Sequence, residues 1–128
     1  MLAPCAGEVV VAFDNRPDMP VPLVDEGYPA GNHFLLRCDR IDILLGHFRQ
    51  GSLQIAIGDS VVVGQQIGEV GNSGETGEPH LHIHAQLPGT PERPFSGAPV
   101  PIRFQGRFLV RNDIVDMTLP PPPSSPER

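Results

Sequence analysis

The chain contains 128 residues with a mass of 13.8 kDa, a hydrophobic content of 39% and a formal net charge of -6. This length allows one small domain and leaves no room for a second of ordinary size. The acidic charge balance disfavours nucleic acid as a partner, because binding to phosphates requires an excess of basic residues. Apolar runs are far shorter than the roughly 20 residues that cross a bilayer, so no transmembrane segment is predicted.

Glycine and proline, with 14 and 16 copies, divide the chain into short runs rich in Val, Ile and Leu. No extended helical periodicity is present, and the pattern predicts a mostly β fold of short antiparallel strands. Residues 33–37 and 41–47 are separated by the length of a hairpin turn, so these two runs are expected to pair. The full set of expected strands is 7–13, 33–37, 41–47, 54–57, 60–63, 66–70 and 81–85.

The other segments are irregular in sequence. Residues 14–30 are rich in proline and predict a long loop that either shapes a groove or is inert. We expect a β domain at 1–86, then a C-terminal extension at 87–117 in which residues 102–110 can add one strand or hairpin. Residues 118–128 form a Pro-rich tail that is expected to be disordered, because it cannot pack a core.

Two features bear on the cellular compartment. The first residues lack the basic and apolar segments of a secretory signal, so either the protein stays inside the cell or its true beginning is missing. Cys5 and Cys38 have no CxxC spacing and lie in or beside apolar runs. Both buried free thiols and a single disulfide are compatible with that setting. We favour the free thiols, which leaves the compartment open.

Three of the five histidines stand at alternate positions, at His80, His82 and His84. In a strand, positions two apart share a face and lie about 6.6 Å apart. Adjacent pairs can therefore share a zinc ion, whereas the outer pair cannot; the alternative is a solvated polar face. Two single histidines, His47 at the end of an apolar strand and His33 at the start of another, are each more typical of packed residues than of ligands. The glycine-rich loop at 71–79 lacks a nucleotide-binding pattern.

Read together in chain order, the motifs resemble the LytM and lysostaphin type of zinc metalloendopeptidases, which cut peptide cross-links in bacterial cell walls. The segments that carry the resemblance are residues 3–10 (APCAGEVV), 31–33 (GNH), 44–48 (LLGHF), 58–61 (GDSV), 63–68 (VGQQIG), 71–74 (GNSG) and 79–82 (PHLH). The match covers roughly residues 3–86. It implies a lysostaphin-like barrel-sandwich hybrid fold (duplicated hybrid motif), a zinc cofactor, a peptidoglycan peptide substrate and a periplasmic or extracellular location.

The resemblance also implies roles for individual residues. His82 matches the metal-binding second histidine of HxH, and His80 matches the first, which acts as general base or hydrogen-bond partner. His47 matches a histidine that helps to stabilise the tetrahedral intermediate, although Gly46 and Phe48 replace the usual Ala and Leu around it. His84 stands where many family members carry an acidic residue. We expect His47, His80 and His82 to meet in one cleft, with His84 at its edge.

One family motif is missing from the chain. The family takes two further zinc ligands from HxxxD, but here Arg37 follows four residues after His33 and Gly51 four residues after His47. We therefore expect a truncated form, in which the first strand of the fold can also be missing, and the alternative is a degenerate member of the family. With one of three expected ligands, the chain should bind zinc weakly and have little or no peptidase activity.

Three functions are weighed against these observations. The favoured function is a zinc metalloendopeptidase domain that hydrolyses cell-wall peptide bonds. The alternative is a non-catalytic LytM-like module that binds wall peptides or regulates another wall hydrolase. A group-carrier domain has similar glycine-containing hairpins, but the chain contains no lysine, which excludes attachment of biotin or lipoate.

Overall fold

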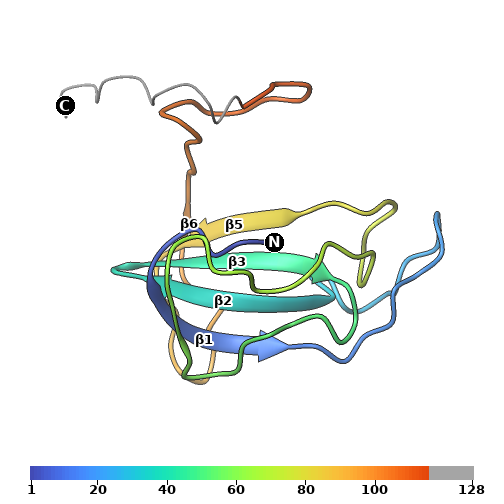
Figure 1. The fold of residues 1–128 in the computed structure, drawn as a ribbon, viewed down its shortest axis with the longest axis horizontal. Helices are drawn as coiled ribbons and strands as arrows, with labels where there is room; N and C mark the ends of the chain where they lie inside the picture. Colours follow the sequence, from blue (N-terminus) through green and yellow to red (C-terminus); the bar gives the residue numbers. More distant parts are fainter. Residues whose placement is uncertain (116–128) are drawn as a thin grey trace.

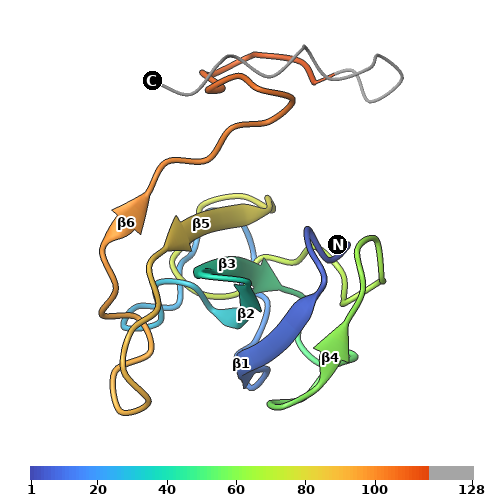
Figure 2. The same ribbon diagram turned by 90° about the vertical axis from the view of Figure 1, so that its left-hand side faces the viewer.

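The computed structural model describes residues 1–115, which form one antiparallel sheet and contain no helix. Six strands lie in the order β4-β1-β2-β3-β5-β6 (Figures 1 and 2). The described residues therefore offer no helix that is long and apolar enough to cross a membrane. The predicted mostly β fold is confirmed, and the Pro-rich tail lies outside the described residues. The strands are β1 (Gly7–Phe13), β2 (Asn32–Cys38), β3 (Ile41–Phe48), β4 (Ser60–Val61), β5 (His82–Gln86) and β6 (Pro99–Val100).

The three long strands are those with the strongest apolar runs. β1 has the bounds that the sequence predicts, and β2 and β3 form the expected hairpin around Asp39, whose φ of 58° suits a tight turn. β5 joins the free edge of β3, with His84 opposite Leu44. Strands β1, β2, β3 and β5 together form the platform on which the candidate site lies.

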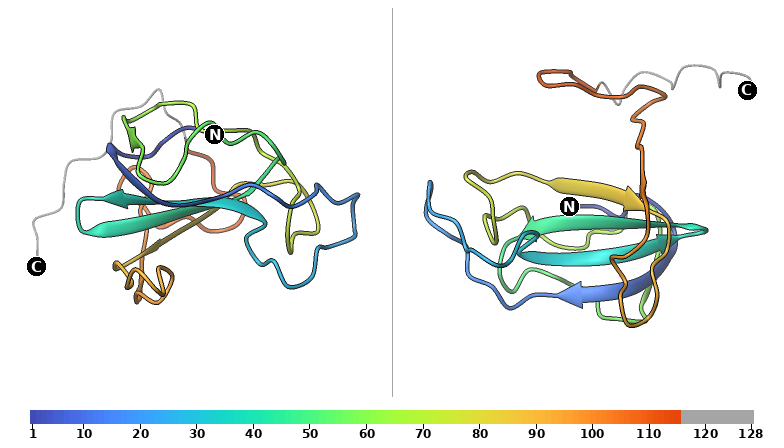
Figure 3. Two further views of the ribbon diagram at one scale, coloured as in Figure 1. Left: turned by 90° about the horizontal axis from the view of Figure 1, so that it is seen from below. Right: turned by 180° about the vertical axis from the view of Figure 1, so that it is seen from behind.

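The sheet has two different faces because side chains alternate along each strand. One face forms the core, which the N-terminal segment and residues 49–70 cover (Figure 3). The opposite face carries Leu35, Leu44 and His84, which are aligned by direct pairing across β2, β3 and β5. Most histidines lie on this opposite face. The buried core residues are Ala3, Val9, Phe34, Leu36, Leu45, Phe48, Val61 and Ile67.

Several short predicted strands are absent or shortened. Residues 54–57 have no ladder: Gln54 donates one backbone hydrogen bond to Ile67, and the chain then turns at Ala56. In 66–70 only isolated bridges occur, and in 102–110 only Phe104 and Arg107 form one. These runs have β-forming composition, but a strand also needs a partner in register over several residues. The predicted strands at 60–63 and 81–85 are Ser60–Val61 and His82–Gln86.

The preference for free thiols is wrong, because Cys5 and Cys38 form a disulfide. Antiparallel pairing of Glu8 with Arg37 brings the start of β1 beside the end of β2. The Cα atoms of the two cysteines lie 5.9 Å apart, within the range for a disulfide. The two residues are 33 positions apart in sequence, so only the strand register brings them together.

Candidate functional site

Three imidazole rings meet where β3 and β5 lie side by side. One ring nitrogen from each of His47, His80 and His82 lies within 4.8 Å of the others. The His47 ring centroid is 4.7 Å from that of His80 and 5.5 Å from that of His82. His47 is buried, while His80 and His82 are exposed. The structure thus brings together the three histidines singled out in the sequence, which are called the histidine cluster below.

A bulge in β3 directs His47 into this cluster. The register shifts between Asn32 and Phe34 on the partner strand, so β3 holds an extra residue there. His47 has a φ of 62°, a left-handed conformation that is uncommon for a residue other than glycine. Its N–H donates to the Ala30 carbonyl at 2.8 Å, and its carbonyl accepts from the Gly71 N–H at 2.9 Å. The two flanking loops therefore hold a strained backbone in place.

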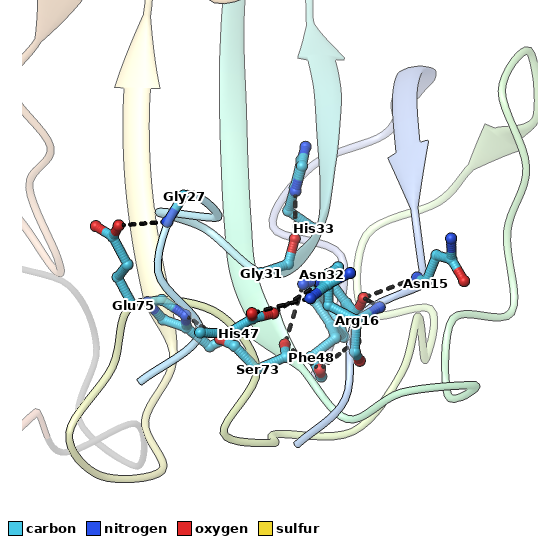
Figure 4. A network of polar contacts seen from close by, with 11 residues as sticks. Asn15, Arg16, Gly27, Gly31, Asn32, His33, His47, Phe48, Ser73 and Glu75 are labelled. Atoms are coloured by element: carbon cyan, nitrogen blue, oxygen red, sulfur yellow. Dashed lines mark hydrogen bonds and ion pairs between the residues drawn. The ribbon is translucent and has the colours of Figure 1, made fainter. Parts of the chain in front are cut away.

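The ring of His47 is fixed by the glycine-rich loop. Its Nδ1 lies 2.7 Å from the Ser73 carbonyl, which can only accept, so Nδ1 carries the hydrogen and Nε2 remains open. The Ser73 hydroxyl accepts from the Asn32 N–H at 3.0 Å and donates to the Phe48 carbonyl at 2.6 Å. Figure 4 shows this network, which ties the loop to β2 and β3 behind the histidine.

His80 is held in a similar way, and His82 is not. The Nδ1 atom of His80 lies 2.9 Å from the Glu78 carbonyl and 3.0 Å from the Thr76 hydroxyl. Thr76 itself donates to that carbonyl at 2.6 Å, so His80 also keeps Nε2 open. Among the described residues, no hydrogen bond engages the ring nitrogens of His82. The cluster therefore presents unprotonated nitrogens that can accept a proton or bind a metal.

Two of these rings resist protonation. Burial lowers the pKa of His47, and repulsion from protonated His80 and His82 lowers it further, against the opposite effect of the hydrogen bond to Ser73. Desolvation also lowers the pKa of His82, with smaller contributions from His80 and His84. Both rings are consequently neutral at pH 7, the state in which imidazole binds metal ions.

An apolar pocket of about 550 Å³ lies on the same face of the sheet. His84 and His33 both line it, so His33 is outside the histidine cluster and His84 lies next to it. The ring of His33 packs between Phe13 and Phe95, at 5.5 Å from each ring centroid, and its Nδ1 lies 2.8 Å from the Gly31 carbonyl. The loop at 14–30 supplies part of the wall, as one of the two readings of that loop predicts.

Several residues of the site are not apparent from the sequence. Ser73 and Glu78 act through backbone carbonyls, which no side-chain motif reveals. Thr76 and Asn32 are buried polar residues. Asn32 bonds to Ser73, which is distant in the sequence, and Thr76 bonds to His80 within the loop before β5. The glycine-rich loop at 71–79 is the one available signal, and its role here is to orient imidazoles.

Solved structures share this fold. The catalytic domain of the antimicrobial peptidase lysostaphin from Staphylococcus simulans is 23% identical, with a TM-score of 0.55 over 72% of this chain and 62% of that one. A zinc-containing peptidase from Vibrio cholerae is 22% identical, with a TM-score of 0.52 over 75% of this chain and 23% of that one. LytU is 24% identical, with a TM-score of 0.51 over 69% of this chain and 53% of that one.

The chain spans less than two thirds of the length of each of these structures. At such identities the likeness establishes a common fold, and it confirms the lysostaphin-like architecture that the sequence predicts. No curated protein matches the sequence. Residues 1–94 match the family model of Peptidase family M23, and the chain therefore belongs to this family.

Proposed function

We propose that the chain is a zinc metalloendopeptidase domain that hydrolyses peptide bonds of bacterial cell-wall peptidoglycan. In this proposal His82 binds the metal, while His80 and His47 act on the substrate. The observation that carries it is the convergence of three imidazoles on one face of an M23-family sheet. The solved structures of similar fold include an antimicrobial peptidase and a zinc-containing peptidase, which supports the same reading.

The chemistry of His82 and its surroundings fits zinc, with His82 as the one expected ligand in this chain. Neutral imidazole nitrogen is a preferred zinc ligand, and each ring places one nitrogen within 4.8 Å of the other two. Carbonyl partners on the Nδ1 atoms of His47 and His80 fix these two rings, so that each keeps an open Nε2 for the substrate. His82 has no such partner and is exposed, so its ring can rotate toward an ion. Weak zinc binding by this chain stays a prediction.

The protein residues can handle the proton of a hydrolytic reaction. Zinc, when bound, would supply Lewis acidity toward the scissile carbonyl and lower the pKa of water. His80 is exposed and keeps its Nε2 open, so this ring suits a general base. The open Nε2 of buried His47 can take up a proton and then donate a hydrogen bond to negative charge on the substrate.

The Cys5–Cys38 disulfide supports a periplasmic or extracellular location. Structural disulfides form and persist in oxidising compartments and are rare in the cytosol. Peptidoglycan lies in the same compartments, so substrate and location agree.

The proposal is tested on an extended form of the chain that supplies an HxxxD motif, because the 128 residues alone are expected to bind zinc weakly and to have little or no peptidase activity. Zinc binding and peptide cleavage by this extended form are compared with those of two variants of it. Zinc affinity is measured by competition with a fluorescent chelator, and cleavage of purified peptidoglycan fragments by mass spectrometry. His82→Ala should weaken zinc binding by about 100-fold or more and abolish cleavage. His80→Ala should keep zinc affinity within a few-fold and lower the cleavage rate by about 100-fold to 10,000-fold.

His84→Gln is the matched control, because it changes a histidine on the same strand and face outside the cluster. Its zinc affinity should equal that of the wild type. Loss of zinc from His84→Gln, or full activity of His80→Ala, would contradict the assigned roles. Zinc binding without cleavage of any fragment would favour the non-catalytic module that binds wall peptides.

A further inference from the structure

The apolar pocket beside the histidine cluster has no place in the proposed chemistry. Phe13 at the end of β1, Tyr28 in the long loop and Phe95 in the segment after β5 surround it. Phe95 lies one residue beyond the part of the chain that matches the family model, which ends at residue 94. The pocket is thus built jointly by the sheet and by chain that the family pattern does not describe. Its lining residues are Phe13, Gly27, Tyr28, Pro29, Ala30, Gly31, His33, Leu44, His84, Gln86 and Phe95.

The lining offers apolar surface and little else. It contains no Asp, Glu, Lys or Arg side chain. Two polar side chains of the lining are already engaged, because His33 Nδ1 lies 2.8 Å from the Gly31 carbonyl and Gln86 Nε2 donates to the Pro94 carbonyl at 2.8 Å. The other polar side chains of the lining are Tyr28 and His84. Burial lowers the pKa of His33, so this ring is neutral at pH 7. A charged group entering the pocket would lose hydration and would meet no Asp, Glu, Lys or Arg side chain with which to form an ion pair.

We propose that this pocket receives an uncharged apolar side chain of the peptide substrate. The inference rests on the proposed function and adds a specificity site to it. Aromatic walls and a volume of about 550 Å³ are typical of pockets that bury apolar groups.

The position of the pocket defines which residue of the substrate enters it. His82 belongs to the cluster and His84 to the pocket, and the two share one face of β5 about 6.6 Å apart. An extended peptide advances by nearly the same distance over two residues and places those two side chains on one side. For a peptide that runs along β5, the apolar residue is therefore about two positions from the bond held at the histidine cluster.

Tyr28 gives a direct readout, because it is the only tyrosine and the chain has no tryptophan. Four capped pentapeptides, Gly-Gly-X-Gly-Gly with Leu, Gly, Lys or Glu at X, are titrated into the 128-residue chain while tyrosine fluorescence is recorded. Calorimetry measures the same affinities independently of Tyr28. The Leu peptide should bind about tenfold or more tightly than the Gly peptide, and the Lys and Glu peptides no better than the Gly peptide. Equal binding of the Leu and Gly peptides, or tighter binding of a charged one, would overturn the inference.

Two variants test whether the preference for the Leu peptide over the Gly peptide comes from the pocket. Phe95→Ala should reduce the preference for Leu over Gly to within about twofold, whereas Phe108→Ala should keep it, since Phe108 is an exposed aromatic residue that does not line the pocket. Loss of preference in Phe108→Ala, or its survival in Phe95→Ala, would contradict this assignment. His82→Ala should lose zinc and keep the preference. If the form extended by HxxxD binds zinc at the cluster and shows no preference, the pocket alone is refuted. If the extended form shows the preference but binds no zinc, the proposed function alone is refuted.

Discussion

At the scale of single residues, the contact between Gly31 and Ser73 leaves no space for a side chain. Gly31 has a φ of 57°, and a Cβ atom there would overlap the backbone of Ser73. Gly31→Ala should therefore lower the free energy of unfolding by about 2–4 kcal/mol, from left-handed strain plus the steric conflict. Gly51→Ala is the control, because Gly51 has a φ of 76° and open space around it. It should cost about 1 kcal/mol. If urea unfolding gives equal losses of free energy of unfolding for Gly31→Ala and Gly51→Ala, the close contact with Ser73 does not affect stability.

His33 gives a pH dependence to stability. Burial lowers its pKa, and the groups that face it are Phe13, Phe95 and, across the pocket, His84. Above about pH 6.5 both the folded and unfolded forms of this residue are neutral, and its contribution to stability is fully present. As pH falls, the unfolded chain binds the proton first, so the contribution is lost as pH falls toward and through the folded pKa.

The variant His33→Asn isolates this effect, because an amide can donate to the Gly31 carbonyl but does not titrate. The difference in free energy of unfolding between wild type and variant should shrink between pH 7.5 and pH 5, as measured by urea titration. His47 and His82, which also have lowered pKa values, are present in both proteins and cancel. A difference that stays constant with pH would show that His33 is not buried in a neutral state.

At the scale of elements, strands that pair with a neighbour close in the chain can be predicted from the sequence. Strands that pair only with a distant segment cannot. β1 and the β2–β3 hairpin have apolar runs and near turns, and the sequence predicts them. β4 and β6 have two residues each, and both depend on strands far away in the chain. Residue spacing and the family resemblance identify His80, His82 and His47. The β3 bulge and the carbonyl of Ser73 leave no trace in side-chain identity, so they could not be predicted.

Asn32 links three elements near the site. It is fully buried, its Oδ1 accepts from the backbones of Asn15 and Arg16, and its Nδ2 donates to the carbonyls of Arg16 and Phe48. Asn32→Ala leaves these groups unpaired and should lower the free energy of unfolding by about 2–4 kcal/mol. Asn15→Ala, at an exposed side chain next to the same network, should change it by less than about 0.5 kcal/mol. Thermal and urea unfolding measure both, and similar losses would contradict a bridging role for Asn32.

At the scale of the whole molecule, the disulfide and the histidine cluster lie at opposite ends of the sheet. Cys38 ends β2 beside the hairpin turn, whereas His47 is near the far end of β3, about 20 Å away along the strand. The disulfide closes a loop between residues 33 positions apart, and its loss should lower the free energy of unfolding by about 3–4 kcal/mol. Because the cluster rests on Ala30, Gly71 and Ser73, the folded chain should keep its zinc affinity without the disulfide.

The double variant Cys5→Ser/Cys38→Ser separates these two effects without a reductant that competes for zinc. Its stability should match that of the reduced wild type, and reductant should not change it further. Its zinc affinity should remain within about twofold of that of the oxidised wild type, because no group that orients His47 or His80 touches either cysteine. Equal urea midpoints for oxidised and reduced wild type would mean that the disulfide does not stabilise the folded chain. A large fall in zinc affinity of the folded double variant would mean that the two ends of the sheet are coupled, since local contacts around the cluster could then no longer account for its geometry.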